Sequence, residues 1–379
     1  MKIYRRSSKP VTETDNNTSP TEKISWFTEH LTRIPFVQKM FFVEHLKTMV
    51  HAGLSLTESL DVLAREIENP KFRKVIGEIK LGVEKGNALS EVFAKHPKVF
   101  PAIYVKMIAA GETSGKLEGA LQEISTQMRK THELTSTIRG ALTYPAVIVV
   151  AMIGIAIMMV TVVLPKLMAL FSEFDTQLPL ATRILIKVSG FMSKPLNLIL
   201  VLGGMALLIF LFAYSLKHFP TFRRLIHKIN LHLPILGPII KKINLARFSL
   251  TLSSLLESTI PIINAIEITA ETVSNMIYKD TLLAAAEKLK SGTPLSEILS
   301  TDHKIFPPMV TEMVMVGERT GEIQHLLNEL ADFYNKEVDK TMKNFATIIE
   351  PIIIILLGLA VGGMAVAVIM PMYSLVQNF

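Results

Sequence analysis

The chain has 379 residues, which is enough for two domains of ordinary size, yet 49% of them are hydrophobic and only 19% are charged. That balance is too apolar for two soluble domains, so we expect part of the apolar sequence to face lipid. The chain has no cysteine, which excludes disulfides, thiolate metal sites and cysteine nucleophiles, and much of its formal charge of +7 comes from one basic segment, which argues against nucleic acid as a partner.

Residues 1–37 are predicted to form a polar tail and a short amphipathic helix. The first part, to about residue 22, is rich in Ser, Thr, Asn and Lys, a composition typical of disorder, and it has no apolar core of a signal peptide. Four apolar residues then recur at helical spacing: Ile24, Phe27, Leu31 and Ile34. This helix, with Trp26 beside its apolar face, is expected either to rest on the membrane surface or to dock against the domain that follows.

An internal repeat organises the rest of the chain, from about Phe42 to Pro165 in its first copy. The two copies align without a gap. Each residue of the first copy matches the residue 206 positions later, as Gly86 matches Gly292. The landmarks of the first copy are Gly86, Leu89, Ser90, Glu91, Phe100, Pro101, Pro145 and Pro165, and their counterparts are Gly292, Leu295, Ser296, Glu297, Phe306, Pro307, Pro351 and Pro371. Chance would not keep one register over such a length, so we infer a duplication.

Each copy has apolar residues at three- and four-residue steps, which predicts helices. In the first copy we expect helices near residues 38–52, 55–67, 70–85, 88–95, 101–110 and 115–141, the last of which runs on into the membrane. Ser55 and Glu58 have the spacing of a capping box, and Asn69-Pro70 and Thr293-Pro294 place a cap residue before a proline. The predicted fold is therefore an all-α integral membrane protein with two duplicated six-helix cytoplasmic bundles, at 38–142 and 244–349, and three transmembrane helices.

The motif GETSGKL, which begins at Gly111, is similar to a phosphate-binding loop but fails as one. Only three residues separate its glycines, and Leu117 stands where a magnesium-binding hydroxyl is needed. We expect instead a tight corner between helices, in which Gly111 ends one helix with positive φ and Ser114 or Thr320 caps the next.

Two glutamates in this corner, Glu112 and Glu318, invite a functional as well as a structural interpretation. A carboxylate in a turn is commonly solvated or paired with a nearby base, and removing its charge then costs little, within about 0.5 kcal/mol. The functional interpretation is a partner contact or a cation held between helices. The motif residues that could serve either role are Gly111, Glu112, Gly115, Gly317, Glu318 and Gly321.

Three runs without a charged residue are each longer than the roughly 20 residues that cross a bilayer. We predict transmembrane helices at 143–165, 195–216 and 350–373, with an external loop at 166–194 and an external C-terminus at 374–379. Tyr144-Pro145 and Glu350-Pro351 mark equivalent points of membrane entry in the two copies. Glycines in the second and third spans permit close helix packing within the chain or between subunits.

The segment 217–243 is predicted to be a basic cytoplasmic linker. From position 217 to 247 the chain has no Asp or Glu, and its basic residues are Lys217, Arg223, Arg224, Lys228, Lys241, Lys242 and Arg247. The positive-inside rule places such a segment in the cytoplasm. The N-terminus is then cytoplasmic and the C-terminus external.

Other constellations that carry chemistry are missing from the sequence. The ten histidines are scattered without an HExxH motif, there is no GxSxG elbow, and the spans contain no internal Asp, Glu, Lys, Arg or His, since Glu350 stands at the mouth of the third. We therefore expect no catalytic residue, metal or cofactor. The alternative functions are a small-solute transporter, which normally needs intramembrane charges, and a membrane-anchored scaffold of another system.

The order of motifs resembles the inner-membrane platform family shared by type II secretion systems, type IV pili and competence pseudopili, known as the GspF or PilC family. Most of the residues that carry the resemblance lie in the first copy: Phe42-Val43-Glu44-His45-Leu46, Gly53-Leu54-Ser55-Leu56, Gly86, Leu89-Ser90, Phe100-Pro101 and Tyr144-Pro145. The motif Gly-Glu-x-Ser/Thr-Gly, which begins at Gly111 and again at Gly317 and is followed by Leu117 or Ile323, also matches, as does Glu350-Pro351. The second copy departs from the pattern, with Thr259 and Pro261 in place of Gly53 and Ser55.

The resemblance implies a platform protein rather than an enzyme. Such a platform couples a cytoplasmic hexameric assembly ATPase to the insertion or extraction of pilin or pseudopilin subunits at the inner membrane. It implies contacts with other inner-membrane machine components, with membrane lipids and with further copies of the chain in a homo-oligomer.

Overall fold

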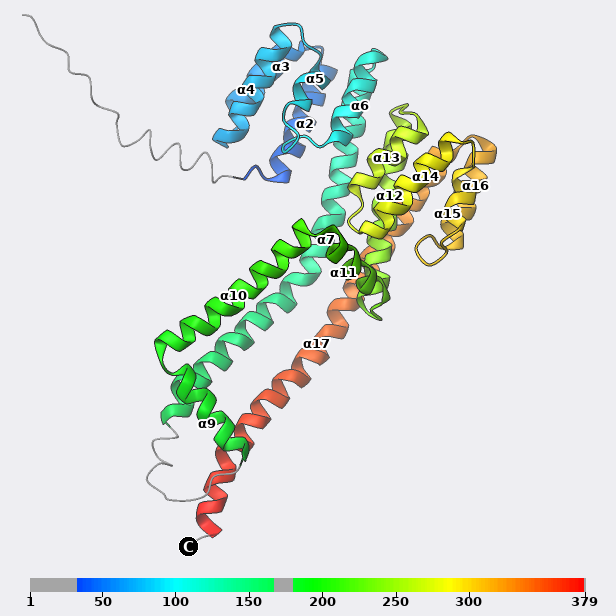
Figure 1. The fold of residues 1–379 in the computed structure, drawn as a ribbon. Helices are drawn as coiled ribbons and strands as arrows, with labels where there is room; N and C mark the ends of the chain where they lie inside the picture. The colour runs from blue at the N-terminus through cyan, green and yellow to red at the C-terminus, as the bar shows by residue number, and fades with distance from the viewer. Residues whose placement is uncertain (1–32, 167–179, 378–379) are drawn as a thin grey trace, which may run out of the picture. The chain divides into compact units, whose positions relative to one another are not determined.

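The computed structural model describes residues 33–166 and 180–377, while residues 1–32, 167–179 and 378–379 lie outside the described part. Every regular element of the described residues is a helix, which confirms the all-α class (Figure 1). The chain forms two compact units, the first ending at Gln122 and the second beginning at Glu123. Most of the expected helix from Ile24 to Ile34 lies outside the described residues, and Arg33 to Pro35 are not helical.

The first unit holds helices α2 to α6 and the first turns of α7. Their bounds are α2 Phe36–His51, α3 Leu56–Glu66, α4 Pro70–Glu84, α5 Leu89–Ala94, α6 Ala102–Thr113 and α7 Leu117–Met158. A buried cluster of phenylalanines forms the centre of the core, with ring centroids 5.5 Å apart for Phe42 and Phe72 and 4.2 Å apart for Phe93 and Phe100. Because these rings come from α2, α4, α5 and the segment before α6, the core joins segments that are distant in the sequence.

Local signals set several helix starts as the sequence predicts. Ser55 and Glu58 form a capping box at α3, and the Asn69 side chain accepts from the amide of Phe72 at 3.1 Å at α4. Thr293 was expected to cap in the same way, but Pro294 occupies the cap position of α15 and has no side-chain cap bond. The helix begins one residue later than the cap pattern predicts, and a glutamate from another helix supplies the acceptor, as described below.

The second unit repeats the arrangement with α12 to α17. The bounds are α12 Leu236–Glu257, α13 Ile262–Thr272, α14 Met276–Lys290, α15 Leu295–Ser300, α16 Pro308–Thr320 and α17 Ile323–Gln377. Phe248 and Tyr278 pack edge-on against Phe306, with centroids 5.3 and 5.4 Å away. Tyr278, the counterpart of Phe72, is fully buried, and its hydroxyl donates to the carbonyl of Ile305 at 2.8 Å, which satisfies the polar atom inside the core.

Among the described residues, three helices are long and apolar enough to cross a membrane, which confirms the expected number of spans. They are α7 with its continuation to Lys166, α10 (Pro195–His218) and α17. Pro145 lies inside α7, and a π-helical turn, η1 (Met159–Val163), follows. The apolar windows of these helices are almost wholly unburied within the chain, as expected for surfaces that face lipid.

The segment between the first two spans contains a helix that the sequence did not predict. The helix α9, Leu180–Met192, lies within the expected external loop and contacts η1, α10 and α17. Its Ser189 hydroxyl donates to the carbonyl of Val160 at 2.8 Å. At 13 residues the helix is too short to cross a bilayer on its own.

Candidate functional site

The corner motif at the end of α6 is attached to α5 by the carboxylate of Glu112. This side chain leaves the last turns of α6 and reaches the first turn of α5, where Oε1 accepts the amide of Leu89 at 2.5 Å. Its Oε2 accepts the amide of Ser90 at 3.0 Å and the hydroxyl of Ser90 at 2.5 Å. The six-residue helix α5 has no side-chain cap of its own, so Glu112 satisfies amides that would otherwise lack an acceptor.

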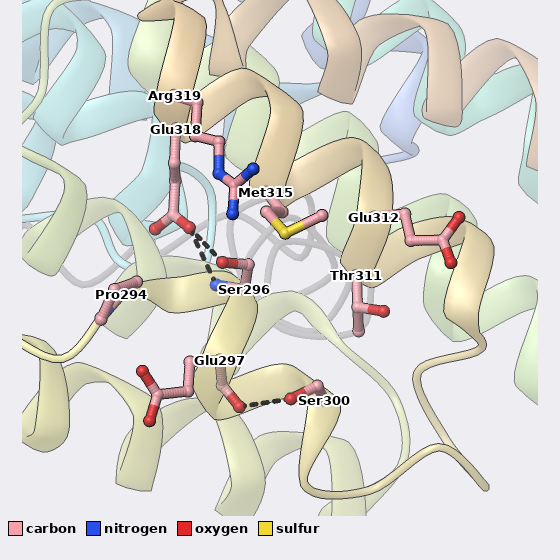
Figure 2. A pocket seen from close by; sticks show the side chains of 9 residues that line it. All are labelled: Pro294, Ser296, Glu297, Ser300, Thr311, Glu312, Met315, Glu318 and Arg319. Carbon is pink, nitrogen blue, oxygen red and sulfur yellow. Dashed lines mark hydrogen bonds between the residues drawn. The ribbon is translucent and has the colours of Figure 1, made fainter.

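The second copy repeats this contact with equivalent residues. Glu318 accepts the amides of Leu295 and Ser296 at 2.6 and 3.1 Å, and the Ser296 hydroxyl at 2.5 Å. Figure 2 shows the two bonds from Ser296. The short helix α15 also has no side-chain cap. A negative charge at the start of a helix is further stabilised by the helix dipole. Each glutamate is therefore engaged in holding two helices together, with three donors directed at its oxygens.

The glycines of the corner play different roles from those expected. Gly111 lies inside α6, and Gly115 has the positive φ, at 68°; the second copy has its positive φ, 78°, at Gly321. A Cβ at Gly317 would lie 2.6 Å from Cα of Ile323, and one at Gly111 would overlap the Cβ of Ala120. The first glycine of each motif therefore permits close approach to the next helix, and the second makes the turn.

The hydroxyls of the corner also differ from expectation. The Ser114 hydroxyl donates to the carbonyl of Ala110 at 2.8 Å, and that of Thr320 to the carbonyl of Val316 at 2.9 Å. Both bonds lie within the helix that ends at the corner. Neither residue caps the first turn of the following helix, because α6 and α16 continue further along the motif than the glycine pattern predicted.

A pocket of about 610 Å³ opens beside Glu318, between α15 and α16 (Figure 2). Its lining residues are Pro294, Ser296, Glu297, Ser300, Thr311, Glu312, Met315, Glu318 and Arg319. The first copy has Lys106 and Thr113 at the positions of Glu312 and Arg319. The repeat thus conserves the glutamate corner within the chain while the charges around it differ, which gives the two bundles different surfaces.

The two carboxylates of this site are used by the fold itself. The carboxylates of Glu112 and Glu318 already accept helix amides and hydroxyls. Within the part of the chain that the structure describes, no group of three or more His, Asp or Glu side chains has the arrangement of a metal site. What remains exposed around the pocket is a mixture of charged side chains, the kind of surface that steers and selects a protein partner.

The predicted membrane-entry residues lie within the two long helices. Tyr144 and Pro145 are in α7, where the tyrosine side chain is exposed, and Glu350 and Pro351 are in α17, where Glu350 is exposed. Both helices pass through their proline without ending. Within the described part of the second unit, no hydrogen bond or ion pair joins Glu350 to Glu318.

A polar layer inside the second unit was not predicted. The Ser254 hydroxyl of α12 donates to Oε1 of Gln127 in α7 at 2.9 Å, and Lys130 donates to Asp332 of α17 at 3.0 Å. Ser249, Thr251, Ser253 and Ser254 are all buried on α12. A run of hydroxyl residues in an otherwise apolar helix is the sequence signal that could have indicated this layer.

Comparison with known families gives two matches along the chain. The family described as "Type II secretion system (T2SS), protein F" matches residues 42–165 and again residues 248–371. These two ranges are the two copies of the internal repeat, which confirms the duplication.

Relatives match over most of the chain. The type IV pilus assembly protein PilC of Thermus thermophilus is 38% identical over 336 residues, which cover 88% of this chain and 82% of that protein. PilC of Pseudomonas aeruginosa is 33% identical over 335 residues, which cover 88% of each chain. The type II secretion system protein F of Vibrio cholerae is 31% identical over 330 residues, which cover 87% of this chain and 80% of that protein.

Proposed function

This chain belongs to the type II secretion system protein F family, and we propose that it is the inner-membrane platform of a type IV pilus, type II secretion or competence pseudopilus machine. In that role it couples a cytoplasmic assembly ATPase to the insertion or extraction of pilin-like subunits. The names of its relatives, pilus assembly protein PilC and secretion system protein F, support the class of machine.

The observation that carries the proposal is the continuity of α17, which extends from Ile323 to Gln377 without a break. Its first turns are part of the bundle core, where Leu327 and Leu330 are fully buried, and its later turns expose Ile354 and Ile355 as a membrane span does. A helix that is packed at one end and embedded at the other transmits a displacement of the bundle to the span, because the two ends move as one element.

The proposal includes a separate ATPase, and the corner motif is the reason. The corner motif that is similar to a phosphate-binding loop is a helix turn in which Gly115 and Gly321 have positive φ, and its glutamates bind helix amides. Because moving a subunit into or out of a bilayer requires energy, a separate ATPase is expected to supply it. The two bundles, which differ around their glutamate corners, offer that ATPase two related docking surfaces.

In this arrangement the bundles lie in the cytoplasm and the spans contact the pilin-like subunits. The basic residues that follow α10 support a cytoplasmic position for the second bundle. Other inner-membrane components and further copies of the chain complete the machine, with small residues such as Gly203 and Gly204 available for helix contacts, since no atom would lie within 4 Å of a Cβ at either position.

The proposal is tested in cells and with the purified chain. Deletion of the chain should abolish pilus assembly or secretion while the pilin-like subunits are still made, and the full-length chain supplied in trans should restore it. The purified chain in detergent should show no ATP hydrolysis of its own and should bind the assembly ATPase encoded beside it. Normal assembly and secretion in the deletion strain, or robust ATP hydrolysis by the chain alone, would contradict the proposal.

A further inference from the structure

The helix α11, Pro220–His232, lies where the membrane span α10 ends. A single residue, Phe219, separates it from His218, the last residue of α10. Phe222 of α11 packs edge-on against Phe212 in the last turns of α10, with ring centroids 5.9 Å apart. Because α10 must leave the bilayer near His218, these contacts hold α11 at the boundary between membrane and water.

One side of α11 is fixed to the second bundle. Leu231 is buried, the amide of Met276 donates to Nδ1 of His227 at 2.9 Å, and the side chain of Asn275 donates to the carbonyl of His227 at 3.2 Å. Arg224 forms an ion pair with Asp280 of α14 at 2.8 Å. These bonds fix the rotation of the helix, so the residues on its other side face away from the bundle.

That other side combines apolar and basic side chains. Leu225 is followed three and four residues later by Lys228 and Ile229, and His232 lies three residues after Ile229, so these side chains share one face of the helix. The apolar members are unusually exposed for their type, 55% for Leu225 and 47% for Ile229, and the neighbouring Phe219 is 58% exposed. Exposed apolar side chains of this size on one face indicate a surface that is covered by something else.

The charges on and next to this face have one sign. No Asp or Glu occurs between Lys217 and Leu256, and within the described residues Lys217, Arg223 and Lys228 have no carboxylate within 4.0 Å. A second copy of the chain is a poor partner, since a two-fold contact would place this basic face against itself. An anionic bilayer surface complements both the charge and the apolar side chains, and it already surrounds α10.

We propose that α11 lies in the headgroup layer of the membrane and binds anionic phospholipids. Leu225 and Ile229 enter the boundary with the acyl chains, while Lys217 and Lys228 reach the lipid phosphates, as long basic side chains do at interfaces. The contact orients the second bundle relative to the bilayer through His227 and Asn275. It does not depend on which machine the chain serves or on which side of the membrane α11 lies.

The test uses the full-length chain, in which no native thiol competes for label. An environment-sensitive fluorophore is attached after Ile229→Cys substitution, and the protein is placed in nanodiscs of phosphatidylcholine. Titration with short-chain phosphatidylglycerol should shift the emission to the blue, while phosphatidylcholine of the same chain length and inorganic phosphate should not. The same fluorophore at the exposed position 291 of the bundle should report no change.

Charge variants distinguish lipid binding by the basic residues near α11 from a general attraction of anionic lipid to a positively charged protein. Lys217→Gln with Lys228→Gln should raise the apparent Kd for phosphatidylglycerol at least tenfold, from about fivefold per charge near a membrane surface. The matched control is Lys288→Gln with Lys304→Gln, two exposed basic residues elsewhere on the second unit, which should change it less than twofold. The proposal would be overturned by an equal emission shift with both lipids or by an equal apparent Kd for phosphatidylglycerol in the two double variants. Efficient crosslinking between two copies at position 229 would also overturn it, in favour of self-association.

Discussion

The hydroxyl of Ser296 donates to the carboxylate of Glu318 at 2.5 Å, across 22 residues of sequence. Together with the two backbone amides that the same carboxylate accepts, this bond attaches the start of α15 to the end of α16. The first copy repeats it between Ser90 and Glu112. The sequence predicts that removing the charge of Glu318 costs little stability, but the structure shows that its carboxylate caps the N-terminus of α15.

This geometry predicts that Glu318→Gln destabilises the second bundle. The substitution removes the negative charge and replaces one of the two acceptor oxygens with an NH₂ group, which faces at least one N–H donor of α15 and cannot accept from it, so we expect a cost of about 1–3 kcal/mol in the free energy of unfolding. The cost expected from the sequence, that of an exposed turn charge, is smaller. Thermal unfolding of the full-length chain in detergent, followed by circular dichroism, measures the difference.

The matched control is Glu312→Gln, on the exposed wall of the same pocket. Since no hydrogen bond of Glu312 is found in the described structure, its loss of charge should change the free energy of unfolding by no more than about 0.5 kcal/mol. Equal melting of the two variants would show that the cap contributes nothing to stability.

The range of each interaction decided what the sequence could predict. The capping box of Ser55 and Glu58 spans three residues and was predictable, because both partners lie in one turn of helix. The bond from Ser90 to Glu112 requires the packing of α5 on α6, which no local pattern describes. The same limit applies to Gly111, since its role depends on how closely Ala120 of the next helix approaches.

Membrane organisation was predictable for a different reason. The long uncharged runs have few alternatives to a spanning helix, so the three spans followed from composition. The helix α9 did not follow, because its 13 residues include Arg183 and Lys187 and fall short of a span. The helix α9 packs against η1 and α17, and these contacts between distant parts of the chain cannot be read from the local sequence.

A second prediction concerns the turn between α12 and α13, where Thr259 has a φ of 59°. The first copy places Gly53 at this point, with a φ of 86°. A β-branched residue in the left-handed region is strained by about 1–2 kcal/mol, whereas glycine adopts it freely. Thr259→Gly should therefore stabilise the second bundle by about 1 kcal/mol, after allowance for the greater entropy of the unfolded chain.

The reverse substitution in the first copy supplies the control. Gly53→Thr should lower stability, since it introduces the strain that Thr259 carries, and open space around Gly53 means that no clash contributes. Both changes are measured as shifts of the melting temperature of the full-length chain. A loss of stability in Thr259→Gly would indicate that the threonine side chain makes a contact worth more than the strain.

The third prediction is that acid weakens the contact of α11 with α14. Burial, and then the nearby Arg223, lower the pKa of His227 below its usual value, and its Nδ1 accepts the amide of Met276 only when unprotonated. A group with a lowered pKa in the folded state contributes stability that is fully present above the unfolded value, about 6.5, and is lost as the pH falls. Hydrogen exchange of the Met276 amide should therefore accelerate, relative to other amides, below about pH 6.

A variant separates this effect from general acid destabilisation. In His227→Asn the side-chain oxygen replaces Nδ1 as acceptor and does not titrate, so the amide of Met276 should keep its protection over the same pH range. Equal acceleration in the wild type and in His227→Asn would assign the pH dependence to other groups.

The last prediction tests the topology with single cysteines in the cysteine-free chain. Lys85 and Ser291 are equivalent exposed positions of the two bundles, and Ser193 is exposed just before α10. One span, the end of α7, separates position 85 from 193, and α10 separates 193 from 291. Positions 85 and 291 must therefore lie on the same side of the membrane and position 193 on the other, whatever the absolute orientation.

With the basic segment after α10 in the cytoplasm, an impermeant thiol reagent on intact cells should label Ser193→Cys alone, and permeabilised cells should label all three. Labelling of 85 and 291 but not 193 would reverse the chain and remove both bundles from the reach of a cytoplasmic ATPase, while different labelling of 85 and 291 would mean that α7 or α10 does not cross.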